Sequence, residues 1–226
     1  ISNLTPQQIY TFQYVTSDNI KIADPYSPLI LDPDNDKWIN NTSTIYPNLP
    51  DYPAGQQYDV SVIQTGMPAY DWKVKNFTKP AKENLIVYEL LVRDFTTEKT
   101  WQSVIDKISY IKGLGVNAIE LMPIMEFEGN NSWGYNPSFH YAFDKAYGTQ
   151  DKFKEFVDTC HENGIAVILD IALNHATQRN SLVRMWSTDT SGGYGSPSTN
   201  NPYFNTSAKH AYSVFEDFNH SKPETR

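Results

Sequence analysis

The sequence has little cysteine, comparatively few basic residues and no long apolar run. Cys160 is the single cysteine among 226 residues, which excludes an internal disulfide and a cysteine-rich metal site. The 18 basic residues are outnumbered by 26 acidic ones, and the net charge of −8 argues against nucleic acid or an anionic membrane as a partner. No apolar run approaches the roughly 20 residues that a membrane-spanning helix needs, so we expect no membrane span.

Aromatic side chains, by contrast, are abundant. They make up 14% of the chain, with 15 Tyr and 5 Trp, and Asn is frequent as well. Aromatic rings beside amide side chains suit sugars, because the rings offer apolar faces and the amides offer hydrogen bonds. The composition therefore favours sugar binding. An acidic chain with one cysteine and many Asn and Tyr fits a secreted or cell-envelope protein of a bacterium, which we slightly favour, but it also fits a cytoplasmic one.

Neither end of the chain resembles a natural terminus. Ile1 begins it without an initiator Met or a signal-peptide pattern, and Arg226 closes it without completing an apolar element. We therefore expect the chain to be part of a longer polypeptide and to have the remainder of that polypeptide as a partner.

The pattern over residues 1–80 predicts short strands joined by turns. Residues 10–15 alternate apolar and polar side chains as a half-buried strand does, and residues 20–23 and 60–64 predict further strands. Pro and Asp crowd residues 24–59, which predicts loops over a surface. This all-β region is short and rich in loops for an independent domain.

The following part of the chain alternates strands and helices. Residues 85–92, 118–121 and 166–173 are nearly continuously apolar, which predicts parallel strands covered on both faces. Thr100 and Thr149 stand where helix N-caps belong, each followed by apolar residues at helical spacing. Strand, helix, strand, helix, strand is the order of a parallel α/β fold.

Reactive groups in parallel α/β folds lie at the carboxyl ends of strands. Arg93 and Asp94 follow the first predicted strand, and we expect them to form a surface ion pair. Trp133 and Tyr135 follow the second strand, in a loop around a glycine. They either offer a platform on which a sugar ring could stack or bury themselves against the rim of the sheet.

The third predicted strand carries Asp170 within an otherwise apolar run and continues to Asn174 and His175. An ionised carboxylate in such a strand is costly unless it is paired. His175 could reach a substrate, a metal ion or a backbone carbonyl, and a single histidine is more often structural. On the residues alone, a functional and a structural role for this group are evenly balanced.

A second group of polar residues, Asp32, Asp34, Asn35 and Asp36, invites a calcium interpretation. It lacks the glycine and the glutamate that a twelve-residue EF-hand loop requires at fixed positions. We therefore expect a solvated turn.

Four segments resemble, in the same order, the motifs of the α-amylase family of glycoside hydrolases. They are the second-strand motif, the loop Ser-Trp-Gly-Tyr, the strand end Asp-Ile-Ala-Leu-Asn-His and the short motif Phe-Glu-Asp-Phe-Asn, at residues 115–123, 132–135, 170–175 and 215–219. Residues 22–26 and 31–33 resemble the β-sandwich that precedes the catalytic barrel in isoamylase, pullulanase and branching-type members.

The resemblance implies an α/β fold, a partial TIM (β/α)8 barrel with about its first three strands, preceded by part of a β-sandwich domain. Residues 1–80 would be the partial, carbohydrate-binding-like sandwich, and residues 81–226 the first part of the catalytic barrel. Residues 174–226 have no strand or helix periodicity and would be the subdomain inserted after the third strand.

The resemblance also implies a substrate-binding role for four residues. Tyr135 would stack on the glucosyl ring at the cleavage site, with Trp133 as a further contact. Asp170 and His175 would hydrogen-bond the hydroxyls of that ring and hold it distorted towards the transition state.

Asn174 and Asp217 match positions that hold a structural calcium ion in many members of the family. Carboxylate and amide oxygens suit this hard cation. The neighbours of Asp217 depart from the usual motif, and no organic cofactor is implied.

The implied function is that of a retaining glycoside hydrolase or transglycosidase that acts on α-1,4 or α-1,6 bonds of starch, glycogen or maltooligosaccharides. Such enzymes need a carboxylate nucleophile and a carboxylic acid/base about 5 to 5.5 Å apart. In this family both follow later strands, so we expect no catalytic residue within this chain and no activity from the chain alone. The alternative is a non-catalytic relative whose barrel serves sugar binding or assembly.

Overall fold

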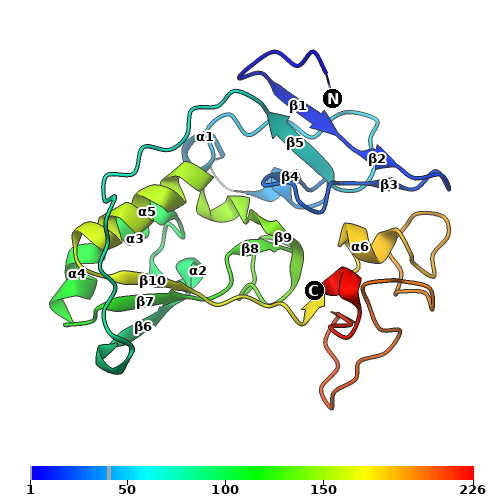
Figure 1. Ribbon diagram of the computed structural model, residues 1–226. Helices are drawn as coiled ribbons and strands as arrows, with labels where there is room; N and C mark the ends of the chain where they lie inside the picture. Colours follow the sequence, from blue (N-terminus) through cyan, green and yellow to red (C-terminus); the bar gives the residue numbers. More distant parts are fainter. Residues whose placement is uncertain (1, 40–41) are drawn as a thin grey trace.

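The computed structural model describes residues 2–39 and 42–226 as a mixed α/β fold. A small N-terminal β region lies beside a parallel sheet with its helices (Figure 1). Residues 174–226 form an irregular C-terminal lobe. In this described part of the chain, no helix is long and apolar enough to cross a bilayer.

Antiparallel strands build the N-terminal β region. β5 (Val60–Gln64) lies between β1 (Ile9–Phe12) and β4 (Ile30–Leu31), while β2 (Tyr14–Val15) pairs with β3 (Lys21–Ile22). The strand predictions for this region are confirmed, although the first predicted strand is divided in two. Short helical turns complete the segment that leads to the parallel sheet: η1 (Asp36–Trp38), α1 (Thr42–Ile45) and η2 (Lys82–Asn84).

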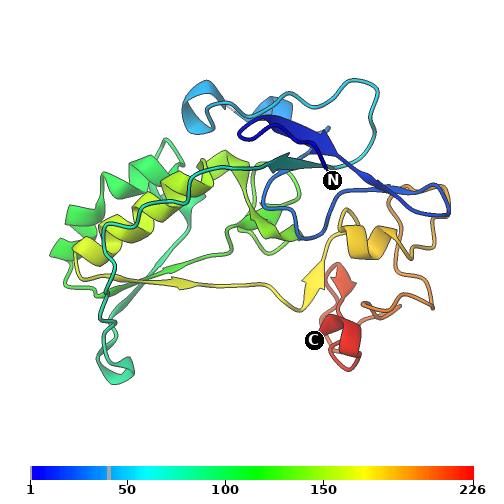
Figure 2. The same cartoon turned by 45° about the horizontal axis from the view of Figure 1, so that its top comes forward.

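The second sheet is parallel, with its strands in the order β10 (Ala166–Leu169), β7 (Ala118–Leu121), β6 (Val87–Leu90). The helices on one face of it are α3 (Trp101–Ile105), α4 (Ile108–Gly113) and α5 (Gln150–Glu162) (Figure 2). Thr100 and Thr149 cap α3 and α5 as predicted, because each side chain accepts a hydrogen bond from a backbone N–H of the first turn. The predicted order of strands and helices is confirmed, except that the first helix is divided between α3 and α4.

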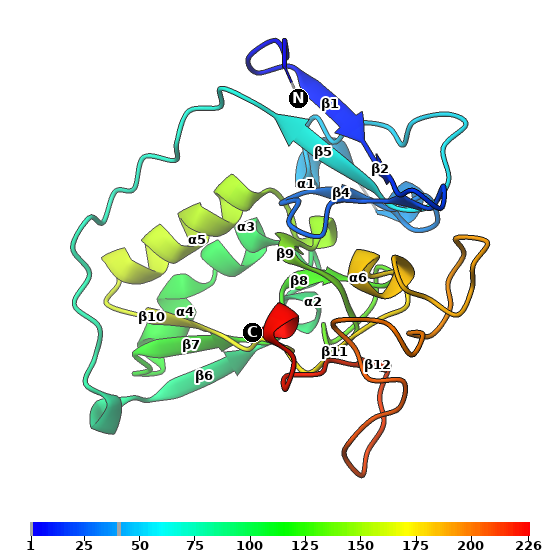
Figure 3. The same ribbon diagram turned by 45° about the vertical axis from the view of Figure 1, so that its right-hand side comes forward.

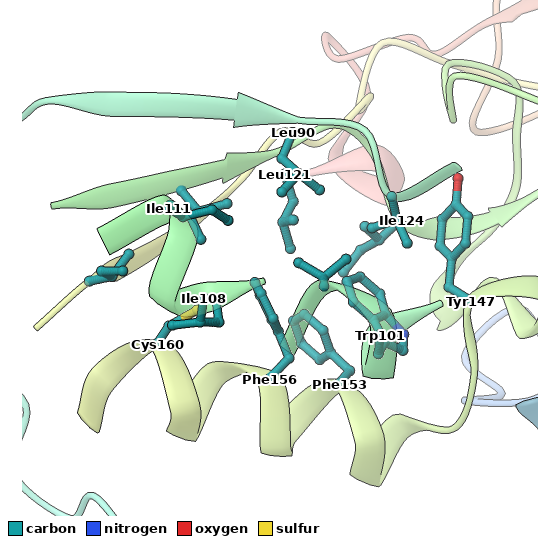
Figure 4. Close-up of a cluster of buried hydrophobic side chains, with 14 of the residues drawn as sticks. Leu90, Trp101, Ile108, Ile111, Leu121, Ile124, Tyr147, Phe153, Phe156 and Cys160 are labelled. Atoms are coloured by element: carbon teal, nitrogen blue, oxygen red, sulfur yellow. The ribbon is translucent and has the colours of Figure 1, made fainter. Parts of the chain in front are cut away.

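The main core lies between this sheet and its helices (Figure 4). The ring of Trp101 lies with its centroid 5.0 Å from that of Phe153 and 5.6 Å from that of Phe156. Leu90 and Leu121 reach the same cluster from the strands. Full burial of a side chain of this size stabilises the fold by about 1.5–3 kcal/mol, so the cluster fixes the helices on the sheet.

The opposite face of the parallel sheet is open, which corrects the prediction that both faces are covered. Val87 and Glu89 are exposed on β6, whereas Tyr88 and Leu90, which alternate with them, pack into the core. Leu169 of β10 is 39% exposed. Within residues 2–39 and 42–226 the sheet does not close into a barrel, so the apolar side chains that the pattern assigned to a second buried face point outward.

The segments that follow the parallel strands carry the remaining elements. β8 (Met125–Phe127) and β9 (Pro137–Phe143) form a hairpin, and β11 (His175–Ala176) pairs with β12 (Glu216–Asp217) in the C-terminal lobe (Figure 3). The remaining helical turns are α2 (Val92–Phe95), η3 (Lys145–Tyr147), α6 (Ser181–Arg184) and η4 (Pro223–Thr225). Most of the C-terminal lobe is irregular, in line with its lack of periodicity.

The acidic turn of the N-terminal region is only partly solvated, which corrects the prediction: Asp34 is exposed, but the turn is tied to the rest of the protein. Arg179 of the C-terminal lobe donates to the carboxylates of Asp32, Asp34 and Asp59 at 2.7, 2.9 and 2.8 Å. Asp32 and Asp59 are buried. The prediction was wrong because the cation that pairs with the turn lies 147 positions further along the chain.

A second buried cation binds the same turn. Lys145 lies with its Nζ 3.2 Å from Asp36, and it also pairs with Glu126. Burial raises the pKa of neighbouring Asp144 to about 7 and raises that of Glu126 as well. One cation therefore faces three carboxyl groups, which favours retention of a proton within this cluster near neutral pH.

Candidate functional site

Tyr135, Asp170 and His175 meet where β10 ends. The hydroxyl of Tyr135 donates a hydrogen bond to Oδ2 of Asp170. The backbone carbonyl of Tyr135 accepts one from Nε2 of His175 at 2.7 Å. The structure thus brings three of the four residues that we predicted to bind substrate into one hydrogen-bonded chain.

The bond to Asp170 favours the protonated form of Tyr135. This hydrogen bond and partial burial raise the pKa of the Tyr135 hydroxyl to about 12, so the hydroxyl keeps its proton and acts as a donor. The backbone N–H of Asp170 donates to the carbonyl of Leu121 at 2.9 Å, which continues the pairing of β10 with β7. Asp170 thus lies just after β10 and is half-buried, and its carboxylate accepts the hydrogen bond from Tyr135, so no unpaired charge is buried within the strand.

His175 is buried, with 5% of its surface exposed. A carbonyl oxygen only accepts hydrogen bonds, so Nε2 of His175 is protonated and donates the hydrogen bond to the carbonyl of Tyr135. Its Nδ1 is buried without a hydrogen-bond partner among the described residues. His175 therefore fixes the backbone of Tyr135 through this hydrogen bond. Its contact with a sugar hydroxyl stays a prediction.

A glycine places the loop that carries the aromatic residues. Gly134 has a φ of +92°, and a Cβ at this position would collide with the carbonyl oxygen of Pro123. Only glycine fits such an approach. The hydroxyl of Ser132 accepts a hydrogen bond from the backbone N–H of Gly134 at 2.9 Å and donates to the side chain of Asn136, which fixes the loop from its other side.

The two aromatic residues beside this glycine face solvent. Trp133 is 60% exposed and Tyr135 is 37% exposed. The sequence left two alternatives open for these residues, and the structure shows exposed rings, not rings buried against the rim of the sheet. The half-exposed ring of Tyr135 leaves apolar surface beside the carboxylate of Asp170, and exposed Trp133 lies two residues before it in the same loop.

Two histidines that the sequence did not single out support the same segment. Nε2 of His140 donates to the carbonyl of Ala172 at 3.1 Å, and Nε2 of His220 donates to that of Leu173 at 2.9 Å. Burial lowers the pKa of His140, which favours its neutral form. These contacts join β9 and the C-terminal lobe to the segment that links Asp170 to His175. No local sequence pattern predicts them.

Asn174 and Asp217, the predicted calcium ligands, lie in neighbouring segments, since β11 pairs with β12, but the Asp217 carboxylate makes other contacts. Oδ2 of Asp217 accepts hydrogen bonds from the Asn205 amide at 2.7 Å and the Lys209 backbone N–H at 3.3 Å. Oδ1 of Asp217 lies 3.2 Å from Nε2 of His210, and Asn174 is exposed. The described residues contain no group of three or more His, Cys, Asp or Glu side chains suited to a metal ion. Both carboxylate oxygens of Asp217 thus have partners within the protein, and the calcium site stays a prediction.

The predicted surface ion pair at the end of β6 is confirmed. Arg93 donates to both carboxylate oxygens of Asp94 at 2.7 Å, and Asp94 is exposed. The hydrogen bonds from Arg93 lower the pKa of the Asp94 carboxyl. This pair needs no functional explanation.

Comparisons with curated proteins agree with the motifs. A malto-oligosyltrehalose trehalohydrolase of Saccharolobus solfataricus is 34% identical over 172 residues, which cover 76% of this chain and 29% of that protein. The chloroplastic isoamylase 1 of Arabidopsis thaliana is 29% identical over 199 residues, with 74% of this chain and 24% of that protein covered.

A solved structure and a family model match most of the chain. A Salmonella typhimurium protein solved as a candidate alpha amylase superposes with a TM-score of 0.68 at 27% identity, over 98% of this chain and 31% of that one. The chain thus spans less than a third of each of these three proteins. The family model for the catalytic domain of alpha amylase matches residues 8–223. The chain therefore belongs to the α-amylase family of glycoside hydrolases.

Proposed function

We propose that this chain is the substrate-holding part of a retaining enzyme that hydrolyses or transfers at α-1,4 or α-1,6 glucosidic bonds. Its substrates would be starch, glycogen or maltooligosaccharides. The observation that carries the proposal is the hydrogen bond between Tyr135 and Asp170, beside exposed Trp133, at the carboxyl end of β10. The names of the relatives, a malto-oligosyltrehalose trehalohydrolase and an isoamylase, support this substrate class.

The chemistry of a glucosyl unit suits these side chains. Such a ring has apolar C–H groups on its faces and hydroxyls around its edge. The rings of Trp133 and Tyr135 would pack against a face, and the carboxylate of Asp170 would accept hydrogen bonds from edge hydroxyls. The Tyr135 hydroxyl donates to Oδ2 of Asp170, and a sugar hydroxyl would donate to Oδ1. Contacts that strengthen as the ring distorts would lower the barrier to bond cleavage.

The nucleophile and the acid/base are proposed to come from polypeptide outside residues 1–226. In support of this, apolar side chains on and after β10 are exposed, among them Leu169, Ile171 and Leu173. Further strands beside β10 and β6 would cover such residues and complete a (β/α)8 barrel, of which this chain would be the first part. The N-terminal region would then be part of a β-sandwich, and the chain alone would be inactive.

Binding of α-linked and β-linked glucans tests the proposal. The complete polypeptide that carries residues 1–226 is titrated with thio-linked maltoheptaose, whose sulfur bridges resist hydrolysis, and with cellohexaose. We expect the α-linked ligand to bind at least about tenfold more tightly, and Tyr135→Ala to remove most of this difference. Tyr110→Ala, which alters an exposed tyrosine of α4, is the matched control and should have no effect. Equal binding of both ligands, or none, would contradict the proposal.

A further inference from the structure

Phe215 has a backbone conformation that is unusual for a bulky residue. Its φ is +45°, in the left-handed region that favours glycine, and its side chain is 52% exposed. Residues in such conformations persist only where the surrounding structure imposes them, and they gather at functional sites. The contacts that hold Phe215 in this conformation, and those that its ring makes, therefore bear on its function.

The loop that carries Phe215 is closed at its base by Asp217. The backbone carbonyl of Asp217 accepts a hydrogen bond from the backbone N–H of Asn205 at 2.8 Å, and its carboxylate accepts one from the Asn205 amide at 2.7 Å. The same carboxylate binds the Lys209 backbone N–H and lies 3.2 Å from Nε2 of His210. These contacts fix the end of the loop two residues from Phe215 and so impose its conformation.

The ring of Phe215 lies over His175. Their centroids are 5.5 Å apart with an interplanar angle of 31°, and β11 pairs with β12 so that His175 is opposite Asp217. His175 in turn donates to the backbone carbonyl of Tyr135. One face of an exposed aromatic ring is thus supported by the same imidazole that supports Tyr135.

We propose that Phe215 is an additional aromatic contact of the sugar site, binding a glucosyl unit adjacent to the unit at Tyr135. The inference rests on the proposed function. A glucosyl unit presents a C–H face that packs against an aromatic ring, and the strained backbone at Phe215 keeps that ring exposed beside the site. The contact would make the site specific for ligands of more than one glucosyl unit.

Variants of Phe215 in the complete polypeptide, titrated with thio-linked maltoheptaose, test the inference. Phe215→Ala should weaken binding about tenfold, and Phe215→Tyr, which keeps the ring, should stay within about twofold of the parent. Tyr212→Ala is the matched control, because Tyr212 is 86% exposed on the same loop, and it should leave binding unchanged. Phe215→Gly should also weaken binding about tenfold, yet the unfolding temperature should not fall, since glycine accepts a φ of +45° without strain.

The outcomes separate the inference from the proposed function. If Tyr135→Ala weakens binding and Phe215→Ala does not, the inference is overturned and the proposed function stands. If Phe215→Ala and Tyr212→Ala weaken binding equally, the effect belongs to the loop and the inference is overturned as well. If the parent polypeptide binds no α-glucan, the proposed function fails, and the inference fails with it.

Discussion

Arg179 and Asp59 form a buried ion pair between two parts of the chain that are 120 positions apart, with 2.8 Å between Nη2 and Oδ1. The same guanidinium donates to Asp32 in the acidic turn. The pair joins the N-terminal β region to the lobe that contains His175. Arg179 is therefore central to the position of that lobe.

Arg179→Ala should destabilise the fold by about 3 kcal/mol, because it leaves the buried carboxylates of Asp32 and Asp59 without the cation that hydrogen-bonds both of them. Chemical denaturation measures the change in the free energy of unfolding. Lys75→Ala is the control, since Lys75 and its partner Asp71 are both largely exposed, and its loss should leave the unfolding midpoint nearly unchanged. Equal effects of the two substitutions would contradict a structural role for the buried pair.

Gly134→Ala should weaken α-glucan binding and lower stability, because a Cβ at this position collides with the carbonyl of Pro123 and would displace Tyr135. Gly129→Ala is a close control in the same loop. Gly129 has a φ of +82°, but a Cβ there meets no atom within 4 Å, so only the conformational strain is added. We expect Gly134→Ala to cost about 2 kcal/mol more than Gly129→Ala in denaturation experiments. Similar costs, with binding intact in both variants, would show that the close approach does not position the loop.

The stability of the fold should depend on pH through the buried cluster around Lys145. The pKa of Asp144 is raised by burial to about 7 in the folded state, against about 3.9 in an unfolded chain. Between these values the folded state holds a proton that the unfolded state has lost. The stabilisation from this group is therefore complete below about pH 4 and is lost as the pH rises through about 7.

Denaturation at pH 5 and pH 8 measures this dependence. Asp144→Asn should reduce the loss of stability between the two pH values, while Asp18→Asn, at an exposed turn, should not alter it. A parent protein that becomes more stable from pH 5 to pH 8, with the same slope in Asp144→Asn, would contradict the raised pKa.

Much of the fold could be predicted from local sequence. The N-caps at Thr100 and Thr149 act within one helical turn, and the strands around Ile119 and Val167 are apolar over consecutive residues. Such signals involve neighbours in the chain. The exposure of Val87 could not be predicted, because a strand's apolar composition does not say how many of its faces another element covers.

The candidate site was predictable in part. The rule that reactive groups follow parallel strands points to Tyr135, Asp170 and His175, and the family resemblance adds their roles in binding a glucosyl ring. The contacts of His140 with Ala172 and the stacking of Phe215 on His175 depend on loops that the sequence pattern leaves undefined. The acidic turn was misinterpreted for the same reason, since its partner is remote in sequence.

The substitution Asp170→Asn tests the central claim, that Tyr135 and Asp170 together hold an α-glucan. The amide keeps the size of the carboxylate but loses its charge and half of its acceptor capacity. In titrations of the complete polypeptide with thio-linked maltoheptaose, we expect binding to weaken about tenfold or more, which corresponds to about 1.4 kcal/mol. Asp94→Asn, which changes an exposed carboxylate that follows β6, on the far side of β7 from β10, should bind as the parent does. Equal affinity of Asp170→Asn and the parent would contradict the account.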